Sequence, residues 1–481
     1  MKRRELIEGR ISRIEYPGKG ILEAGDVRVV VKNALPGQKV RCRITKVHGD
    51  RAEAELLEIL EEAGDSVESA CLHFGKCGGC TYLTVPYVKE LGIKEQQVRG
   101  IIFPVIGRQK EHFTWEGIKT SPIRFGYRNK MEFTFGDEEK DGPLALGMHR
   151  RGSMHDIVTV TGCRIVDDDF RMILSGTLEY FSGMYARGEV SYYHRVRQTG
   201  YLRHLLVRKA AKTGEILIDL VTTTQEEHDL APFCEKMLGL TLRGTITGIL
   251  HTRNDSVSDA VKDEGTEILY GRDYYNEVLL GMSFRVSTFS FFQTNSLSAE
   301  VLYETVRDYI LSLDDLIKPD AAYYDDGSSA VKKHVIMDLY CGTGTIAQII
   351  APVAEKVIGV EIVPEAVQAA RENTAANKLK NVTFYEGDVG EVLEKLSEKP
   401  DIIVLDPPRD GVHPKALRRV IELSADNIVY VSCKPTSLAR DLEPLLAGGY
   451  YVRRAVALDQ FPWTQHVETC VLLSKSNAST D

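Results

Sequence analysis

The chain has 481 residues, of which 43% are hydrophobic, 27% charged and 8% aromatic. This composition is typical of a soluble globular protein and excludes collagen-like, coiled-coil and disordered chains. The 60 basic and 69 acidic residues give a net charge of −9, which excludes a protein that is basic over its whole surface but allows a local basic surface. At about 150 residues for each domain, the length predicts about three domains.

The N-terminal segment MKRRELIEGR is charged and has no apolar stretch, so we expect no signal peptide. No run of 18 apolar residues predicts a membrane span. We therefore expect a cytoplasmic protein without a membrane partner. Its nine cysteines should be reduced, and clustered cysteines are then better explained as metal ligands or catalytic groups than as disulfides.

The first 60 residues contain 13 Lys and Arg against 9 Asp and Glu and are predicted to form five short strands. The segment 39–47 alternates, with apolar residues at 40, 42 and 44 on one face and Arg41 and Arg43 on the other. Five short strands in so few residues predict a small closed barrel, because closure hides the strand edges. The arginine-bearing face fits an RNA-binding barrel or a barrel with solvated charges, and charge alone does not separate the two.

An acidic and polar segment, residues 61–70, is expected to be a linker. Residues 71–285 combine predicted strands and helices without a repeat. Within them, Ser191–Arg208 holds four arginines, two histidines and three tyrosines but no acidic residue. This mixture suits phosphate contacts and base stacking in RNA binding, although a solvated strand pair explains it equally well.

From about residue 286 the chain alternates apolar strands, glycine-containing loops and helices. Strands are expected at 335–340 and 356–362, helices at 346–355 and 364–377, and later strands in NVTFYEGD, DIIVLD, NIVYVSC and a final hairpin. This alternation predicts a parallel doubly wound sheet. The polar segment 317–333 is expected to be a surface loop.

Acidic residues end four successive strands of this predicted sheet. They are Asp338, Glu361, Asp388 and Asp406. The carboxyl ends of parallel strands form the edge at which such folds bind ligands. The loop 340–345 carries glycines that allow close approach to a ligand, but the dinucleotide pattern G-x-G-x-x-G is absent. Because four acids repel a pyrophosphate and attract a cation, the pattern favours S-adenosylmethionine over NAD.

Candidate reactive groups follow the later strands. In LDPPRDG, Arg409 takes the position at which amino-methylating enzymes keep an aromatic residue, which argues against N-methylation. Cys433 ends the fifth strand beside Lys434, whose charge is expected to favour the thiolate. Glu468 precedes the last strand and supplies a carboxylate, and Gln293 offers an amide to a base or to the cofactor.

A thiol and a carboxylate at an edge that binds a methyl donor suggest methylation at carbon. Addition of a thiolate to C6 of uracil makes C5 nucleophilic toward a sulfonium methyl group. A base must then remove the C5 proton before the thiol is eliminated. Cys433 and Glu468 are the candidates for these two roles.

Four cysteines form a second constellation, namely Cys71, Cys77 and Cys80 in CLHFGKCGGC and the distant Cys163. The spacing C-x5-C-x2-C with a fourth cysteine is compatible with a four-thiolate site for zinc or for an iron–sulfur cluster. Glycines at 75, 78 and 79 open the backbone between the first three, which argues against four unrelated buried thiols.

The motifs DLYCGTGT, LDPPRDG, VSCKPTSLARDL and HVETCVLL resemble the RNA (uracil-5-)-methyltransferase family, and the resemblance extends over the whole chain. It implies that residues 1–62 form a TRAM domain, an OB-like β-barrel that binds RNA. It further implies that residues 63–285 form a mixed α+β central domain with an iron–sulfur site and an RNA-binding surface. Residues 286–481 are then a Rossmann-like, S-adenosylmethionine-dependent methyltransferase domain, and the chain as a whole is an α/β protein.

The resemblance also implies roles for individual residues. The cofactor-binding positions are Gln293, Tyr340, Glu361, Asp388 and Asp406, the nucleophile is Cys433, the base is Glu468, and the ligands of a [4Fe–4S] cluster are Cys71, Cys77, Cys80 and Cys163. Two features depart from the family pattern. The segment 317–333 is longer than usual, and Lys434 stands where asparagine is common.

Family members with a TRAM domain and four cluster cysteines mostly modify 23S rRNA, which is therefore the expected substrate of a monomeric enzyme. The alternative substrate is the T-loop of tRNA. A radical S-adenosylmethionine methylthiotransferase is disfavoured because its C-x3-C-x2-C spacing is absent. A non-catalytic RNA-binding assembly factor is disfavoured because Cys433 and Glu468 are both present.

Overall fold

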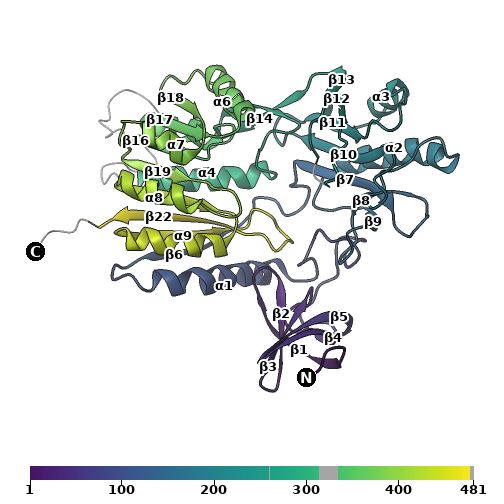
Figure 1. Ribbon diagram of the computed structural model, residues 1–481, viewed down its shortest axis with the longest axis horizontal. Helices are drawn as coiled ribbons and strands as arrows, with labels where there is room; N and C mark the ends of the chain where they lie inside the picture. The colour runs from purple at the N-terminus through teal and green to yellow at the C-terminus, as the bar shows by residue number, and fades with distance from the viewer. Residues whose placement is uncertain (259–260, 314–333, 477–481) are drawn as a thin grey trace, which may run out of the picture.

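The computed structural model describes residues 1–258, 261–313 and 334–476. The chain folds into an N-terminal barrel, a central domain and a C-terminal domain, and the barrel lies below the other two in Figure 1. The expected surface loop at 317–333 and the last five residues lie outside the described part of the chain.

The N-terminal strands close into a barrel in the order β1-β2-β3-β5-β4, as the sequence predicted. The strands are β1 (Leu6–Glu15), β2 (Lys19–Ala24), β3 (Val27–Lys32), β4 (Lys39–His48) and β5 (Arg51–Glu61). The predicted alternation of β4 is confirmed, because Val40, Cys42 and Ile44 lie in the barrel core while Arg41 and Arg43 point to solvent.

The central domain is built on a seven-stranded sheet in the order β13-β12-β11-β10-β7-β8-β9. Its elements are β7 (Lys130–Asp137), β8 (Leu144–His149), β9 (Ile157–Thr159), α2 (Asp168–Ala186), β10 (Leu202–Lys209), β11 (Glu215–Thr222), α3 (Ala231–Leu238), β12 (Thr245–Arg253) and β13 (Thr266–Gly271). A two-stranded ribbon of β14 (Tyr274–Leu279) and β15 (Met282–Ser287) follows. The apolar face of α2, including Phe170 and Phe181, packs with α3 into the core of this domain.

The C-terminal domain contains an eight-stranded sheet in the order β18-β17-β16-β19-β20-β22-β21-β6. The strands are β6 (Thr114–Lys119), β16 (His334–Leu339), β17 (Ala354–Glu361), β18 (Val382–Glu386), β19 (Ile402–Leu405), β20 (Asn427–Ser432), β21 (Tyr450–Leu458) and β22 (Glu468–Lys475). The first five in sheet order are parallel, and β22 then pairs antiparallel with β20 and with β21.

Helices cover both faces of this sheet (Figure 1). One face packs against α4 (Ser296–Leu311), α5 (Thr345–Ile350) and α6 (Pro364–Ala376), and the other against α1 (Tyr87–Ile106), α7 (Val389–Lys395), α8 (Pro414–Leu423) and α9 (Pro435–Ala447). Because both faces are buried, the parallel strands are continuous apolar runs such as IIVL in β19.

One expected domain boundary differs from the structure. The segment from α1 to β6 belongs by sequence position to the expected central domain, residues 63–285. In the structure β6 pairs in parallel with β21, and α1 packs on the same sheet beside α9. This pairing joins strands about 340 residues apart, so no local sequence pattern announces it.

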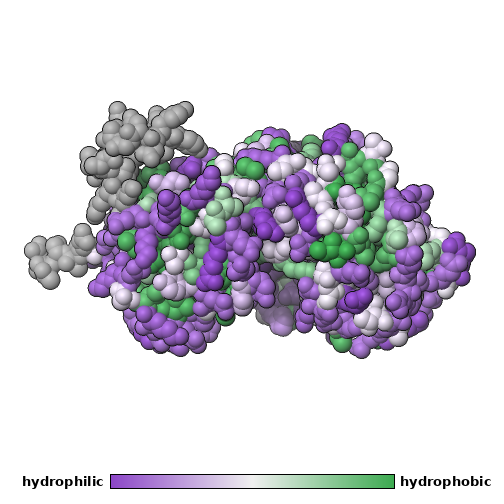
Figure 2. All heavy atoms as spheres, turned by 90° about the horizontal axis from the view of Figure 1, so that it is seen from above, coloured by the Kyte–Doolittle hydropathy of each residue, from purple (hydrophilic) through white to green (hydrophobic). Residues whose placement is uncertain are grey.

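The outer surface is mostly hydrophilic in the view of Figure 2, with apolar side chains in separate patches. None of the helices within the described residues has the length and apolar character needed to cross a bilayer. All nine cysteines belong to the described part of the chain and carry free thiols.

Candidate active site

The edge formed by the carboxyl ends of the parallel strands gathers the predicted acidic residues. Asp338 is the penultimate residue of β16, Glu361 ends β17, and Asp406 follows β19 directly. The ends of these three strands lie level with one another, since Leu339 of β16 pairs with Val360 of β17 and with Leu405 of β19. The prediction that these acids meet at one edge is therefore confirmed.

The glycine loop between β16 and α5 takes a strained backbone path. Tyr340, Gly342 and Gly344 all have positive φ angles, of 68°, 52° and 72°. A side chain at position 344 would collide with Phe384, because an added Cβ would lie 2.6 Å from its ring. A non-glycine residue in this conformation costs about 1 to 3 kcal/mol, so the strain at Tyr340 marks a loop whose shape is held by its surroundings.

Glu361 fixes that loop from the neighbouring strand. Its Oε2 accepts a hydrogen bond of 3.0 Å from the Gly342 N–H, and its Oε1 accepts bonds from the N–H groups of Ile362 and Val363. Asp388 lies after β18 and is exposed, and its Oδ1 caps α7 by accepting from the N–H groups at 390 and 391. Asp388 thus acts as the N-cap of α7 and uses one carboxylate oxygen for this role.

Gln293 lies just before α4 and is held by two hydrogen bonds. Its Oε1 accepts from Gln460 Nε2 at 2.8 Å, and its main-chain carbonyl accepts from Asn129 at 2.8 Å. Asn295 in turn donates to the carbonyl of Gln460. The segment around Gln460 therefore orients the predicted cofactor-binding amide, a role that no sequence motif indicated.

Cys433 and Glu468 are brought together by the antiparallel pairing of β20 and β22. Ser432, the last residue of β20, pairs with Thr469. Cys433 follows the end of one strand and Glu468 begins the other, so the two side chains belong to the same corner of the sheet. Glu468 is 3% exposed, which places its carboxyl group in an environment poor in water.

Burial raises the pKa of the Cys433 thiol to about 11. The carboxylates of Glu468 and Asp406 act in the same direction, whereas the Arg409 guanidinium lowers the pKa of this thiol by its charge and by a hydrogen bond. The cation expected to do this, Lys434, lies instead 3.6 Å from Asp410. Arg409 is thus the residue that favours the thiolate, and the sequence-based choice of Lys434 is wrong.

The two buried carboxyl groups of the site have raised pKa values. Burial and the neighbouring Asp406 raise the pKa of Glu468 to about 8, although the charge of Arg409 opposes them. Burial raises the pKa of Asp406 to about 7. Perturbed carboxyl groups beside a thiol and an arginine are characteristic of catalytic sites.

The loop carrying Arg409 is fixed by α9. Asp441 is buried and accepts hydrogen bonds of 2.7 Å from the Val412 N–H and from the Tyr430 hydroxyl. Ser437 donates to the carbonyl of Arg409 at 2.8 Å. No sequence pattern indicated this supporting role, although Ser437 and Asp441 lie within the VSCKPTSLARDL motif.

A neutral histidine completes the surroundings of Arg409. Arg409 Nη2 donates to His466 Nδ1 at 2.9 Å. Burial, followed by the charge of Arg409, lowers the pKa of His466 to about 4, so the imidazole is an acceptor at neutral pH. This contact links the Arg409 loop to the segment that leads into Glu468.

The four candidate metal ligands pack against one apolar core in the central domain. Burial raises the pKa of Cys80, and the charges of Cys163, Cys77 and Cys71 raise it further. The Gly79 N–H donates to the Cys77 sulfur at 3.4 Å. Within residues 1–258, 261–313 and 334–476, however, no three His, Cys, Asp or Glu side chains are arranged to hold a metal ion. The four cysteines thus share one core without forming a metal-holding group, and the cluster itself stays a prediction.

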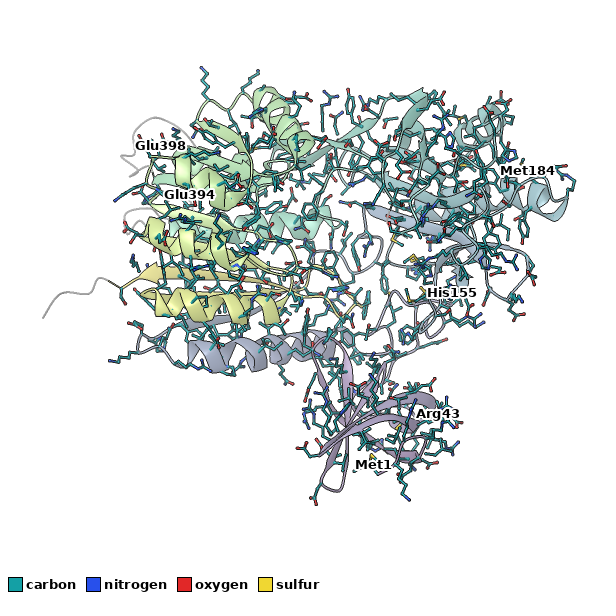
Figure 3. All side chains as sticks on the ribbon, in the orientation of Figure 1. Met1, Arg43, His155, Met184, Glu394 and Glu398 are labelled. Carbon is teal, nitrogen blue, oxygen red and sulfur yellow. The ribbon has the colours of Figure 1, made fainter. Side chains whose placement is uncertain are left out.

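The basic face of the barrel is largely neutralised by glutamates. Arg41 lies 2.8 Å from Glu8 and 2.6 Å from Glu58, and Arg43 lies 2.6 Å from Glu55. Figure 3 shows Arg43 on the side of the barrel away from the C-terminal domain. Exposed ion pairs of this kind contribute about 0 to 1 kcal/mol, so phosphates can compete for these arginines.

Two arginines of the basic segment 191–208 are structural. Arg208 is buried and donates to the carbonyls of Thr288 and Ser290. Arg203 is also buried and donates to main-chain carbonyls at 254, 256 and 258. The interpretation of this segment as an RNA-binding surface is wrong for both residues, because their guanidinium groups donate hydrogen bonds to main-chain carbonyls inside the fold.

Comparisons with known sequences agree with this site. The family model for tRNA (uracil-5-)-methyltransferases matches residues 327–476. The chain is 44% identical over 477 residues to an uncharacterized RNA methyltransferase of Clostridium tetani, covering 99% of each chain. It is also 44% identical over 479 residues to an uncharacterized RNA methyltransferase of Caldanaerobacter subterraneus subsp. tengcongensis, covering 99% of this chain and all of the relative.

A solved structure shares the fold. The tRNA (uracil-54, C5)-methyltransferase of Pyrococcus abyssi, in complex with S-adenosyl-L-homocysteine, superposes with a TM-score of 0.73. It covers 97% of this chain and 100% of its own, at 24% sequence identity. The whole architecture, barrel included, thus has a counterpart among solved structures.

Proposed function

We propose, from the premise that the chain belongs to the RNA (uracil-5-)-methyltransferase family, that it methylates C5 of a uridine in 23S rRNA through a covalent cysteine adduct. It is an S-adenosylmethionine-dependent enzyme by that membership. The observation that carries the proposed mechanism is the meeting of Cys433 and Glu468 at one corner of the sheet, beside Arg409.

The chain's own groups can perform each proton and bond change. The Cys433 thiol first gives up its proton to water, a loss that burial opposes and the charge of Arg409 favours. The thiolate then adds to C6 of uracil and leaves C5 as the nucleophile. S-adenosylmethionine, when bound, would supply an electrophilic methyl group, whose bond to sulfur would break, leaving the electron pair on sulfur, as its bond to C5 forms. The Glu468 carboxylate then removes the C5 proton, the C5–C6 double bond re-forms, and the bond between sulfur and C6 breaks to return the thiolate.

The donor set at the sheet edge fits a cationic methyl donor. Glu361, Asp406 and Gln293 offer carboxylate and amide oxygens, and we propose that they hold the cofactor together with Tyr340 and Asp388. The pKa of Asp338 is raised well above its usual range by burial and by Asp406. Such crowding of acids is relieved by a bound cation, which favours a sulfonium compound over an anionic one.

Covalent trapping on RNA that contains 5-fluorouridine tests this proposal. Fluorine at C5 cannot be removed as a proton, so the wild-type enzyme should accumulate an adduct visible by denaturing electrophoresis. Cys433→Ala should lose both adduct and methylation, while the matched control Cys234→Ala, a buried thiol in α3, should keep both. Trapping by Cys433→Ala would refute the assignment.

Glu468→Gln separates the later step from the earlier ones. It should form the adduct on unmodified RNA and transfer the methyl group, and then stall before elimination. A stalled, methylated adduct detected by mass spectrometry supports the role of Glu468 as the base. Failure to form any adduct would place Glu468 in an earlier step.

The choice of RNA is open to a direct measurement. The resemblance favours 23S rRNA, whereas the matched family model is named for tRNA, so the T-loop of tRNA is the second candidate. Mass-spectrometric mapping of 5-methyluridine in both RNAs, from cells with and without this enzyme, decides between them. A missing 5-methyluridine in tRNA alone would refute the 23S rRNA assignment.

We also propose that Cys71, Cys77, Cys80 and Cys163 bind a [4Fe–4S] cluster. Their packing against one apolar core and the N–H donated to Cys77 support this proposal, because thiolate ligands are stabilised by such donors. Protein purified without oxygen should be brown and contain about four irons per chain, and Cys163→Ser should lose the chromophore while Cys42→Ser, in the barrel core, keeps it. Stoichiometric zinc without visible absorbance would refute the cluster.

The enzyme is further proposed to be a cytoplasmic monomer. Analytical sedimentation tests the oligomeric state, and cell fractionation tests the location.

A further inference from the structure

The turn between β1 and β2 leaves the barrel and rests on the C-terminal domain. Gly18, in this turn, has a φ of 95°, and its N–H donates to the Glu15 carbonyl at 2.9 Å. The space beside its Cα is filled by Gln465, because an added Cβ would lie 2.9 Å from Gln465 Oε1. The turn therefore sits against residues 459–467, the segment that leads into Glu468.

Tyr16 is the aromatic residue of this turn, and its ring belongs to the active-site side of the molecule. The side chain is half-buried and packs against the apolar cluster between the C-terminal sheet and helices α1 and α7–α9. It does not belong to the cluster that fills the barrel. A separate contact docks the barrel, because Ile14 packs against the cluster of Leu35, Tyr82, Val85 and Ile93.

The electrostatic surroundings of Tyr16 are those of the catalytic corner. Burial raises the pKa of its phenol, the charge of Arg409 lowers it, and the charges of Cys433 and Glu468 raise it. These three residues are the ones that carry the proposed chemistry. The phenol is consequently neutral at physiological pH and lies within electrostatic range of the thiol and of the base.

We propose that Tyr16 is an active-site residue supplied by the barrel, and that its ring forms a wall of the site against which the target nucleotide of the RNA stacks. This inference rests on the proposed function. A partly exposed, uncharged aromatic ring on the turn that contacts the segment leading into Glu468 suits the stacking by which proteins hold unpaired RNA bases. The barrel is then part of the catalytic site as well as a surface for binding RNA elsewhere.

A purely structural role for Tyr16 makes a different prediction. If the ring only fastened the turn to the segment 459–467, any apolar side chain of similar size would replace it. Tyr16→Leu keeps apolar volume in the contact but has no flat face for stacking. Tyr16→Phe keeps the flat face and loses only the hydroxyl.

The test measures adduct formation with 5-fluorouridine RNA under subsaturating RNA, together with S-adenosylmethionine affinity and thermal stability. Tyr16→Phe should remain close to the wild-type rate, while Tyr16→Leu should fall about 5- to 150-fold, the range expected when one base–aromatic stack is removed. Both should bind S-adenosylmethionine normally. Leu57→Ala, at an exposed barrel position, should match the wild type.

Two results would overturn the inference. One is a Tyr16→Leu enzyme that is folded and forms the adduct as fast as the wild type. The other is a Tyr16→Leu enzyme whose activity is restored in full at saturating S-adenosylmethionine, because the defect would then lie in the cofactor site. In either case, adduct formation by the wild-type enzyme still tests the proposed function independently of Tyr16.

Discussion

Replacing Lys94 by methionine should destabilise the segment that positions the active site. Lys94 lies on α1, and its Nζ is 2.8 Å from Glu90, 2.6 Å from Asp459 and 3.1 Å from the carbonyl of Phe461. All three charged side chains are 0% exposed. The Lys94 ammonium thus ties α1 to residues 459–467, which end beside Glu468.

The size of the effect follows from the charges left behind. Methionine fills nearly the same volume, so the apolar contacts of the lysine stem are retained. The two carboxyl groups keep their neutral donors, the Tyr87 hydroxyl at 2.8 Å from Asp459 and the Trp463 N–H at 2.7 Å from Glu90. Removing one partner of a buried ion pair costs about 3 to 5 kcal/mol, which in a domain of this size lowers Tm by about 6 to 20 °C.

The destabilisation should depend on pH with a defined sign. Burial is the main cause that raises the pKa of Glu90 to about 7, and removal of the Lys94 charge raises it further. The pKa of a carboxyl group is about 4.3 in the unfolded chain. When the pKa in the folded protein is higher, the group stabilises the fold at pH values below about 4.3, and this stability is lost as the pH rises through the folded pKa. Lys94→Met should therefore lose more stability at pH 8.5 than at pH 5.5.

Thermal unfolding at pH 5.5, 7.0 and 8.5, followed by circular dichroism, measures this difference. Lys89→Met is the matched control, because Lys89 lies on the same helix in an exposed pair with Asp65, worth about 0 to 1 kcal/mol. Lys94→Met combined with Asp459→Asn should recover part of the stability by removing one buried charge. A Lys94→Met protein as stable as the Lys89→Met control at pH 8.5 would refute the reasoning.

Three further predictions concern the site and the barrel. Methylation under saturating substrates should rise from pH 6 to 9, because Glu468 must be ionised and burial raises its pKa to about 8, and because burial also raises the pKa of the Cys433 thiol, to about 11; a pH profile flat over this range would contradict this. Asp441→Ala should lower methylation and cost about 1 to 3 kcal/mol for each buried donor it leaves unpaired, whereas wild-type activity and Tm would exclude its positioning role. Deleting residues 1–62 should reduce RNA affinity and reduce the log–log salt slope by about 0.7 for each phosphate that the barrel neutralises, while calorimetric affinity for S-adenosylmethionine stays the same; an unchanged slope would show that the barrel binds no phosphates.

The sequence predicted the sheet edge well because its information is local. Each strand of the parallel core is an apolar run that ends in a polar residue, and the topology of such sheets brings those ends together. Asp338, Glu361 and Asp406 could therefore be placed at one edge from the sequence alone. The structure adds the pairing of β20 with β22, which brings Cys433 close to Glu468. The order of the motifs in the sequence had only suggested this proximity.

The failures concern contacts between segments far apart in the sequence. Nothing near residues 114–119 indicates that they pair with β21. The arginines at 203 and 208 resemble surface charges in sequence, and only the fold shows that they satisfy buried carbonyls. The position of the β1–β2 turn could not be predicted for the same reason, because Gly18 lies against Gln465 and Tyr16 packs against the cluster of the C-terminal domain.

The charges of the site explain how one carboxyl group can serve late in the reaction. Burial raises the pKa values of Asp338, Asp406 and Glu468, and the charge of Asp406 adds to the effect at Asp338 and Glu468. A bound cationic methyl donor would lower these pKa values by compensating negative charge. Methyl transfer would remove the positive charge of the sulfonium and the negative charge of the uracil enolate together, so the net charge that faces Glu468 would stay the same. The high pKa that burial gives Glu468 would therefore persist at the step in which the C5 proton must leave, which suits a base. Loss of the sulfonium charge would also weaken the hold of the acidic edge on the spent, neutral thioether.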